Sequence, residues 1–319
     1  MTVINQGIKS VNIQKCFVCG SGGVDLYSGM RDRLFGAPGV WSISRCSNAL
    51  CGFMWLNPQP LPEDTGKLYT GTYYTHKPPE YSRLKRLTRR LKQGGFGRLV
   101  WSSMYHQGEK KGRLLEVGSG AGYYLNEMRG LGWTVEGVDF DDGAVKCAKD
   151  AYGLNVQRGT LKQCCFPDNT FDAITANHVL EHIHDPFSLL KECLRILKPG
   201  GCLVVTCPNA KSLGHKLFKD ACYHLDPPRH LYAFTNDSLK ALARKAGLKV
   251  LSARSTVNAA RHIFTTSREI RRIGKSPQEY MPSKFERALG VLFMAIELIT
   301  LIVNKDAGEE LVLVARKNR

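Results

Sequence analysis

The sequence lacks several features that would each point to a familiar class of protein. It contains no internal repeat and no low-complexity tract, so neither a repeat architecture nor a biased, disordered composition is indicated. Its opening residues, MTVINQGIKS, do not show the charged and apolar regions of a secretory signal. Its one long apolar run, residues 288–303, is interrupted by Glu297 and is short for a membrane span. We therefore expect a cytoplasmic protein that is not integral to a membrane.

Acidic residues are also scarce. The chain has 28 Asp and Glu against 45 Lys and Arg, which gives a formal net charge of +17 over 319 residues. Such an excess favours an anionic partner, which leaves nucleic acid, a phosphorylated or acidic metabolite and an anionic membrane surface open. The apolar fraction of 43% is enough for a folded core, and the length suits a medium-sized domain with a small additional module.

Eleven cysteines in a reducing compartment are better explained as metal ligands or core residues than as disulfides. Two pairs, Cys16 with Cys19 and Cys46 with Cys51, are each followed by glycine, as in the tight turns that bring two thiolates together. Four thiolates complete a closed tetrahedral zinc site, so the pattern predicts structural Zn²⁺ in an N-terminal ribbon. The alternative is that these are unrelated reduced cysteines. The remaining seven are interpreted as small buried apolar residues.

After Gly112 the pattern alternates strands with helices, which is typical of a parallel sheet with crossover helices. The expected strands are 113–117, 134–138, 155–158, 173–176, 202–206, 248–253 and 310–315. The expected helices are 123–131, 142–151, 186–197 and 235–246. We predict a zinc ribbon at 1–62, a linker with a basic helical segment at 63–112, and an α/β domain at 113–319. Insertions at about 209–234 and 258–305 interrupt that domain and are expected at its ligand-binding sheet edge.

A glycine-rich turn follows the first strand of this domain, in RLLEVGSGAG. Glycines let the backbone turn tightly and approach a ligand, and the helix that follows offers free N–H groups. Glu116 lies in the strand just before Gly118, where a carboxylate can meet a cationic ligand. The next strand ends at Asp139, which is placed to accept hydrogen bonds from two ribose hydroxyls. The turn by itself is as compatible with NAD as with S-adenosylmethionine (SAM).

Four ordered segments carry a more specific resemblance: EVGSGAG, GVDF, FPDNTFDAITANHVLEHIHDP and LRILKPGG. Over residues 113–208 and the last strand, GEELVLVARK, the chain resembles class I SAM methyltransferases. It is most similar to the branch of ubiquinone-biosynthesis O-methyltransferases and glycan-cluster enzymes. The resemblance implies a Rossmann-like sheet of seven strands, the last of them antiparallel. The cysteine pairs, with RCSNALCGFMWLNPQP, also resemble the N-terminal zinc ribbon of some glycan-associated methyltransferases.

By position, the resemblance implies a SAM site. Gly118, Gly120 and Gly122 would pack against the methionine moiety, Asp139 would hold the ribose, and Phe140 would lie beside the adenine. The full set of expected cofactor-binding residues is Glu116, Gly118, Ser119, Gly120, Gly122, Asp139, Phe140, Thr160, Leu161 and Asn177. Thr160 and Leu161 would border the adenine, although Thr160 stands where such families usually carry Asp. Asn177 and His178 would lie nearest the transferred methyl group.

Histidines and a glutamate cluster in NHVLEHIHDP, with His178, Glu181 and His182 spaced to share one face. His230, in the first insertion, is a further candidate. These four are our expected catalytic residues, with three interpretations left open. Glu181 and His182 have a structural role, one histidine is the general base that deprotonates an acceptor hydroxyl, or the group binds a second divalent metal such as Mg²⁺, Mn²⁺ or Zn²⁺.

The sequence thus predicts a SAM-dependent methyltransferase, acting on oxygen of a sugar-like or lipid-linked small molecule. An RNA methyltransferase and a non-catalytic SAM-binding interaction protein are the alternatives. The basic segment at 81–92 and the apolar run at 288–303 leave open peripheral contact with the inner face of a membrane. The apolar run is equally suited to a buried insertion helix or to the interface of a homo-oligomer.

Overall fold

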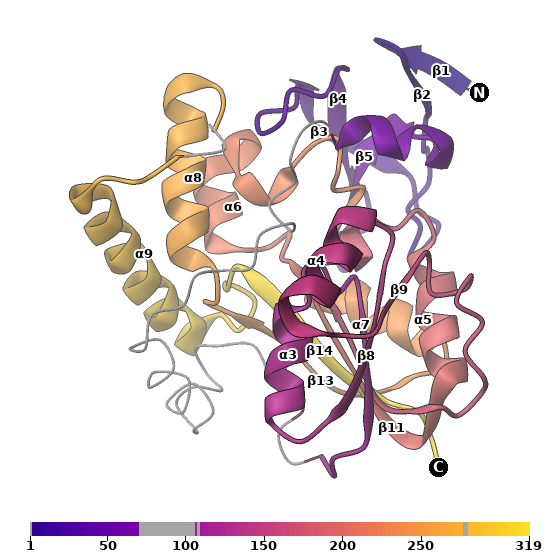
Figure 1. Cartoon of the computed structure of the whole chain (residues 1–319). Coiled ribbons are helices and arrows are strands. Elements are labelled where there is room, and N and C mark those ends of the chain that lie inside the picture. The colour runs from indigo at the N-terminus through magenta and orange to yellow at the C-terminus, as the bar shows by residue number, and fades with distance from the viewer. Residues whose placement is uncertain (1, 70–105, 107–108, 277–279) are drawn as a thin grey trace. The chain divides into compact units, whose positions relative to one another are not determined.

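The computed structural model describes residues 2–69, 106, 109–276 and 280–319. The chain divides into two compact units (Figure 1). The first unit comprises Met1–Gly71, Cys207–Ala241 and Arg254–Leu311, and the second comprises Thr72–Thr206, Leu242–Ala253 and Val312–Arg319. The N-terminal module and the two predicted insertions therefore belong to the same unit. The basic segment predicted at 81–92 lies outside the described residues.

A seven-stranded sheet provides the second unit with its core, in the order β13-β14-β11-β10-β7-β8-β9. The strands are β7 (Arg113–Val117), β8 (Thr134–Asp139), β9 (Val156–Arg158), β10 (Phe171–Asn177), β11 (Leu197–Pro208), β13 (Lys249–Thr256) and β14 (Glu310–Arg316). The five strands from β11 to β9 are parallel to their neighbours. β14 is antiparallel to β11, because Gly200 N–H donates to Lys317 O whereas Asn209 N–H donates to Glu309 O. The predicted fold class is confirmed.

The helices that connect these strands begin and end where local signals place them. They are α3 (Tyr123–Gly130), α4 (Asp142–Tyr152), α5 (Pro186–Ile196) and α7 (Asn236–Lys245). The Asp141 carboxylate caps α4 by accepting from Ala144 N–H, and Gly153, with a φ of 60°, ends that helix. Asp185 caps α5, and Pro186 occupies its first turn. Each observed end lies within one residue of its prediction.

Two small antiparallel sheets form the N-terminal part of the first unit. One has the order β1-β2-β6, and the other β12-β5-β4-β3. Their strands are β1 (Thr2–Asn5), β2 (Ile8–Val11), β3 (Gly23–Met30), β4 (Trp41–Cys46), β5 (Met54–Asn57), β6 (Gln59–Pro60) and β12 (Tyr232–Ala233), and η1 (Pro62–Leu68) follows β6. β12 belongs to the first insertion and pairs with β5, with Tyr232 opposite Trp55. The sheet β12-β5-β4-β3 is therefore completed by a strand that lies far from the other three in the sequence.

The insertions supply the helices of this unit: α6 (Leu213–Phe218), η5 (Lys219–Ala221), η6 (Tyr223–Leu225), α8 (Ala260–Ile273) and α9 (Lys284–Val303). α9 contains the apolar run and begins with a capping box of Ser283 and Glu286. One face packs on α8, where the Phe264 and Phe293 rings stack with centroids 5.0 Å apart. Other apolar side chains of α9 are exposed, Val303 at 88%. Among the described helices, none is long and apolar enough to cross a membrane.

A buried arginine holds the N-terminal module to the first insertion. The Arg229 side chain is fully buried and donates from its two terminal nitrogens to both oxygens of Asp32, at 2.6 and 2.8 Å. It also donates from Nε to Asp226, at 3.0 Å, and lies over the Phe35 ring. The guanidinium keeps the pKa of Asp32 below its ordinary value against the opposing effect of burial. Paired and hydrogen-bonded in this way, three buried charges are tolerated in the interior.

Replacing Arg229 with Met should lower the free energy of unfolding by about 3–5 kcal/mol, because two buried carboxylates would lose their partner. Arg195 is the matched control, since it also pairs with two acids, Glu192 and Asp168, but is partly exposed. Arg195→Met should change stability by less than about 1 kcal/mol. Urea denaturation of both variants is the measurement. Equal effects would contradict the assigned importance of the buried pairs.

Candidate functional site

The predicted glycine-rich turn follows β7 and leads into α3. Gly118, Gly120 and Gly122 all have positive φ angles, of 69°, 51° and 77°. A Cβ atom at Gly118 would lie 2.5 Å from the Val179 side chain, and one at Gly122 would lie 2.6 Å from Leu154. Both the backbone conformation and the close packing therefore require glycine at these positions. The turn leaves a backbone surface that a ligand can approach closely.

Asp139 ends β8 beside this turn and is hydrogen-bonded to it. Its Oδ2 accepts from Gly120 N–H at 2.8 Å, and its Oδ1 accepts from Asp141 N–H at 2.9 Å. The residue is 7% exposed, and burial raises the pKa of its carboxyl group above the ordinary value. Each carboxylate oxygen has a further lone pair, so the group can accept two more hydrogen bonds from a ligand.

Glu116 is the second acid at the turn, inside β7. It is 3% exposed, and within the described part of the chain its Oε2 has no hydrogen-bond partner. Burial, followed by the neighbouring charge of Asp139, raises its pKa well above the ordinary value. A buried acid with an unpartnered oxygen is unfavourable unless a ligand compensates for it. The pair is thus suited to a ligand with positive charge and hydroxyl groups, which fits the sulfonium and ribose of SAM.

The other expected cofactor residues differ in their surroundings. Phe140, next to Asp139, exposes 60% of its surface. Ser119 is buried, and its hydroxyl has no partner among the residues that the structure describes. Leu161 is 3% exposed and contributes to the core, whereas Thr160 is exposed and donates its hydroxyl to Gln163 Oε1 at 2.9 Å. The Asn177 side-chain oxygen accepts from the Thr206 hydroxyl.

His178 follows β10 with a strained backbone, since its φ is 52° and it is not glycine. Its N–H donates to Thr206 O at 3.0 Å. Its Nδ1 lies 3.0 Å from Oε1 of Glu181, which is fully buried, while the His178 side chain is 34% exposed. When Glu181 is ionised, Nδ1 carries the proton and Nε2 is the basic nitrogen. Glu181 and His182 lie in η4 (Leu180–His182).

His230 belongs to the first unit, unlike the three residues just described. Its Nδ1 lies 2.7 Å from the backbone oxygen of His224. The structure therefore brings His178 and Glu181 into direct contact. His182 lies in the same short helix as Glu181. The expectation that His230 acts with them stays a prediction.

The four predicted cysteines converge in the first unit. The sulfur atoms of Cys16 and Cys51 are 3.7 Å apart, and those of Cys19 and Cys46 are 3.4 Å apart. All four lie within 4.8 Å of one another, and none forms a disulfide. Tetrahedral zinc with thiolates at about 2.3 Å would separate the sulfurs by about 3.8 Å. The donor set and its spacing therefore fit a closed, four-coordinate metal site.

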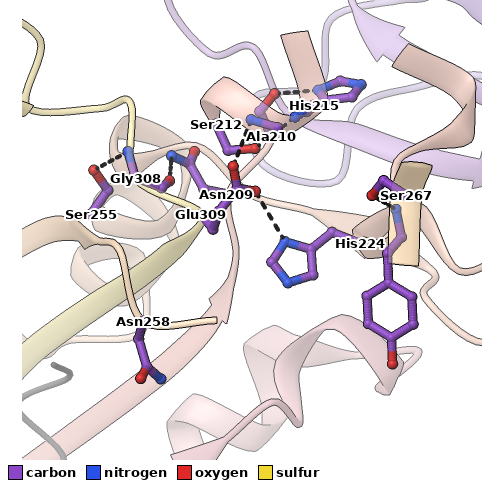
Figure 2. A network of polar contacts seen from close by, with 12 residues as sticks. Asn209, Ala210, Ser212, His215, His224, Ser255, Asn258, Ser267, Gly308 and Glu309 are labelled. Atoms are coloured by element: carbon purple, nitrogen blue, oxygen red, sulfur yellow. Dashed lines mark hydrogen bonds and ion pairs between the residues drawn. The ribbon is translucent and has the colours of Figure 1, made fainter. Parts of the chain in front are cut away.

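Figure 2 shows a buried polar network in the first unit that the sequence did not predict. Glu309 accepts from Gly214 N–H at 2.5 Å, and its other oxygen lies 3.8 Å from His224 Nδ1. Glu297, on α9, is also fully buried. Burial raises the pKa of both carboxyls, and for Glu297 the charge of Glu309 raises it further. No local pattern links these residues, because they come from segments that are far apart in the sequence.

The family described as a methyltransferase domain matches residues 84–253, which is more than half of the chain. A probable S-adenosylmethionine-dependent methyltransferase of Mycolicibacterium smegmatis is 32% identical over 97 residues, covering 30% of this chain and 38% of that protein. A ubiquinone biosynthesis O-methyltransferase of Thiobacillus denitrificans is 31% identical over 149 residues, covering 43% and 64%. The chain thus spans less than two thirds of the length of these relatives.

Among solved structures, the phosphoethanolamine N-methyltransferase 2 of Haemonchus contortus, in complex with phosphomonomethylethanolamine and S-adenosylhomocysteine, is similar with a TM-score of 0.50. The likeness covers 83% of this chain and 63% of that one at 18% identity. At 18% identity, the similarity shows a shared fold alone.

The substitution Glu297→Gln should stabilise the protein increasingly as the pH rises. The folded pKa of Glu297 is raised above its ordinary value of 4.5, so the folded state binds more protons than the unfolded state above that pH. Wild-type stability should therefore fall with rising pH, by at most about 1.4 kcal/mol per pH unit from this group, and the variant should lack that loss. Urea denaturation at pH 5, 7 and 8 measures the difference.

The exposed Glu63 provides the control for the substitution itself, because Glu63→Gln replaces a carboxyl group at the surface. A Glu297→Gln variant that is less stable than wild type at every pH would mean that the ionised carboxylate is favourable where it lies. That result would overturn the assignment of Glu297 as a buried neutral acid.

Proposed function

Because the chain belongs to the methyltransferase-domain family, we propose that it transfers a methyl group from SAM to a hydroxyl of a sugar-like or lipid-linked small molecule. The choice of SAM as the cofactor is supported by the pair of buried acids, Glu116 and Asp139, at a turn that accepts only glycine. The observation that favours a hydroxyl acceptor is the contact of His178 with Glu181. O-methyltransferases among the relatives support the same choice.

In this proposal the second unit binds SAM through residues at the ends of two strands, β7 and β8. Gly118, Gly120 and Gly122 let the backbone lie against the methionine moiety, and Asp139 accepts hydrogen bonds from the ribose hydroxyls. Glu116 offers its unpartnered oxygen to the positive charge of the ligand. Phe140 offers an exposed ring for the adenine. When bound, SAM supplies a methyl group that is already activated on a sulfonium, so the protein's task is largely to position the acceptor.

His178 would act as the general base. Its Nε2 accepts the proton of the acceptor hydroxyl, while Nδ1 donates to Glu181, which fixes the ring and stabilises the resulting imidazolium. The strained backbone of His178 is consistent with a residue held in place for function. The alternative in which Glu181, His182 and further ligands hold a divalent metal remains a prediction.

The four-cysteine group supports structural zinc in the N-terminal module. Two of its ligands flank the hairpin turn after β4, and Cys46 N–H donates to Phe53 O at 2.8 Å, which fixes that turn. Four thiolates leave no open coordination position, so the ion would stabilise the module and take no part in the methyl transfer.

Incubation with methyl-labelled SAM and a cell lysate, followed by separation into aqueous, nucleic-acid and organic-extractable fractions, tests the proposed function. Label is expected in a small-molecule fraction. Asp139→Ala should weaken SAM binding by roughly 100-fold, because two hydrogen bonds to a buried carboxylate are lost. The neighbouring, exposed Asp142 is the control, and Asp142→Ala should bind SAM as wild type does.

His178→Gln should reduce the turnover by about 100-fold or more while leaving the affinity for SAM unchanged. Full activity of this variant would contradict the assignment of His178 as the general base and leave only a structural role for it. Label confined to the nucleic-acid fraction would instead support an RNA methyltransferase. SAM binding without transfer to any fraction would support a non-catalytic SAM-binding protein.

Replacing Cys46 and Cys51 together with Ser should remove about one zinc per chain and destabilise the N-terminal module, because two of four ligands are lost. Metal analysis of the purified protein and its thermal unfolding are the measurements. The adjacent pair Cys164 and Cys165, which lies in the other unit, is the control, and its double Ser variant should retain the metal. Unchanged zinc content in the first variant would contradict the assigned site.

A further inference from the structure

A pocket of about 780 Å³ lies within the first unit, and no residue of it has a role in the function proposed above apart from the zinc ligand Cys46 at its wall. It is bounded by β3 and β4 of the N-terminal module and by α6 of the first insertion. Its volume falls in the range of small-molecule sites. Val24, Leu26 and Met54 supply apolar surface to the wall.

Four cationic side chains line this pocket: Arg45, Lys211, Lys216 and Lys219. No Asp or Glu is among the lining residues. Lys211 approaches Asp237 only to 3.9 Å, and within the described residues the other three form no ion pair. Four like charges around one cavity repel one another unless an anion occupies it.

A neutral histidine and a tyrosine complete the wall. His215 Nδ1 lies 2.7 Å from Ala210 O, so this nitrogen carries the proton, and Nε2 accepts from the Tyr27 hydroxyl at 3.1 Å. Burial lowers the pKa of His215, and the charges of Arg45 and Lys216 lower it further. The histidine is therefore a neutral member of the wall, and its lowered pKa is due first to burial and only then to the two cations.

Lys219 is held in an unfavourable backbone conformation directly after α6. Its φ and ψ are 52° and −123°, a combination that glycine adopts readily and that costs other residues about 1–3 kcal/mol. Its side chain lines the pocket. A lysine kept where glycine would be more stable indicates that the ammonium group has a use there.

We infer that this pocket binds the phosphate or pyrophosphate group of a small molecule. Its cations surround the anionic group, and its apolar wall accommodates an uncharged part of the same ligand. A half-open pocket with one tyrosine in its wall suits a small phosphorylated molecule better than a nucleic acid, which is bound on extended basic grooves with several stacking rings. This pocket belongs to the first unit, whereas the proposed SAM site belongs to the second.

Calorimetric titration of the full-length protein with inorganic pyrophosphate tests the pocket. Wild type should bind it, and Lys216→Ala and Lys219→Gly should each weaken binding about tenfold, since each removes a charge-assisted contact. Lys219→Gly also relieves the strained backbone, so its thermal stability should equal or exceed that of wild type. Loss of binding in that variant then cannot be ascribed to misfolding. Lys149→Ala, at an exposed position of α4, is the charge control and should bind as wild type does.

Several results would overturn the inference. The wild-type protein could fail to bind pyrophosphate, or both pocket variants could bind it as tightly as wild type does. Lys149→Ala could also lose as much pyrophosphate affinity as the pocket variants. Much tighter binding of a single-stranded RNA oligonucleotide, lost in the same pocket variants, would assign the pocket to nucleic acid and contradict a small-molecule ligand.

The two proposals are separated by measuring SAM affinity and lysate methylation in the same variants. Lys219→Gly should leave SAM affinity unchanged, because Lys219 belongs to the first unit and the proposed SAM site to the second. Methyl transfer without pyrophosphate binding would overturn the assignment of the pocket as a phosphate site and leave the proposed function standing. Pyrophosphate binding without any methyl transfer would overturn the proposed function and leave the phosphate-binding pocket standing.

Discussion

The first unit depends on the pairing of one buried arginine. Arg229 lies in the first insertion, Asp32 lies in the N-terminal module, and both side chains are fully removed from water. Because a buried charge without its partner is strongly unfavourable, neither segment can adopt its observed structure without the other. A second link between the same two segments is the hydrogen bond between Tyr27 of β3 and His215 of α6, in the wall of the cationic pocket. A module that resembles an independent ribbon in sequence is therefore part of a larger folding unit.

The second unit has the opposite arrangement, since its buried acids are incompletely satisfied. Among the described residues, Glu116 keeps an oxygen without a partner, and the carboxyl of Asp139 is buried beside it. Such groups reduce the stability of the protein without ligand and are stabilised when a cationic, hydroxyl-bearing molecule binds. The glycine turn is the complementary feature, because it removes side chains from the place where that molecule would lie. The incompletely satisfied acids therefore lower the stability of the protein without ligand at this edge of the sheet.

Local signals explain why so much of the second unit could be predicted. A strand, a turn that only glycine adopts and a capped helix are each encoded within a few consecutive residues, and the ends of parallel strands meet at one edge. Asp139 and Gly120 were therefore expected to be near each other. Tyr27 and His215 are 188 residues apart, and Glu309 contacts His224 across two insertions. Irregular segments carry no period, so tertiary packing alone determines these contacts. The strain at Lys219 is invisible in sequence because lysine is common at helix ends.

The methyl transfer proposed above would require little of the second unit beyond orientation and removal of a proton. Features that distinguish this chain from other members of the family are therefore expected outside the matched region. The family match begins at residue 84, so it leaves out the whole N-terminal module, whose β3 and β4 form one side of the cationic pocket. The other side is α6, from an insertion that is joined to that module through Arg229. A pocket with one wall outside the matched region, built from two segments that fold together and lined by four cations, is where this chain would bind a phosphorylated small molecule.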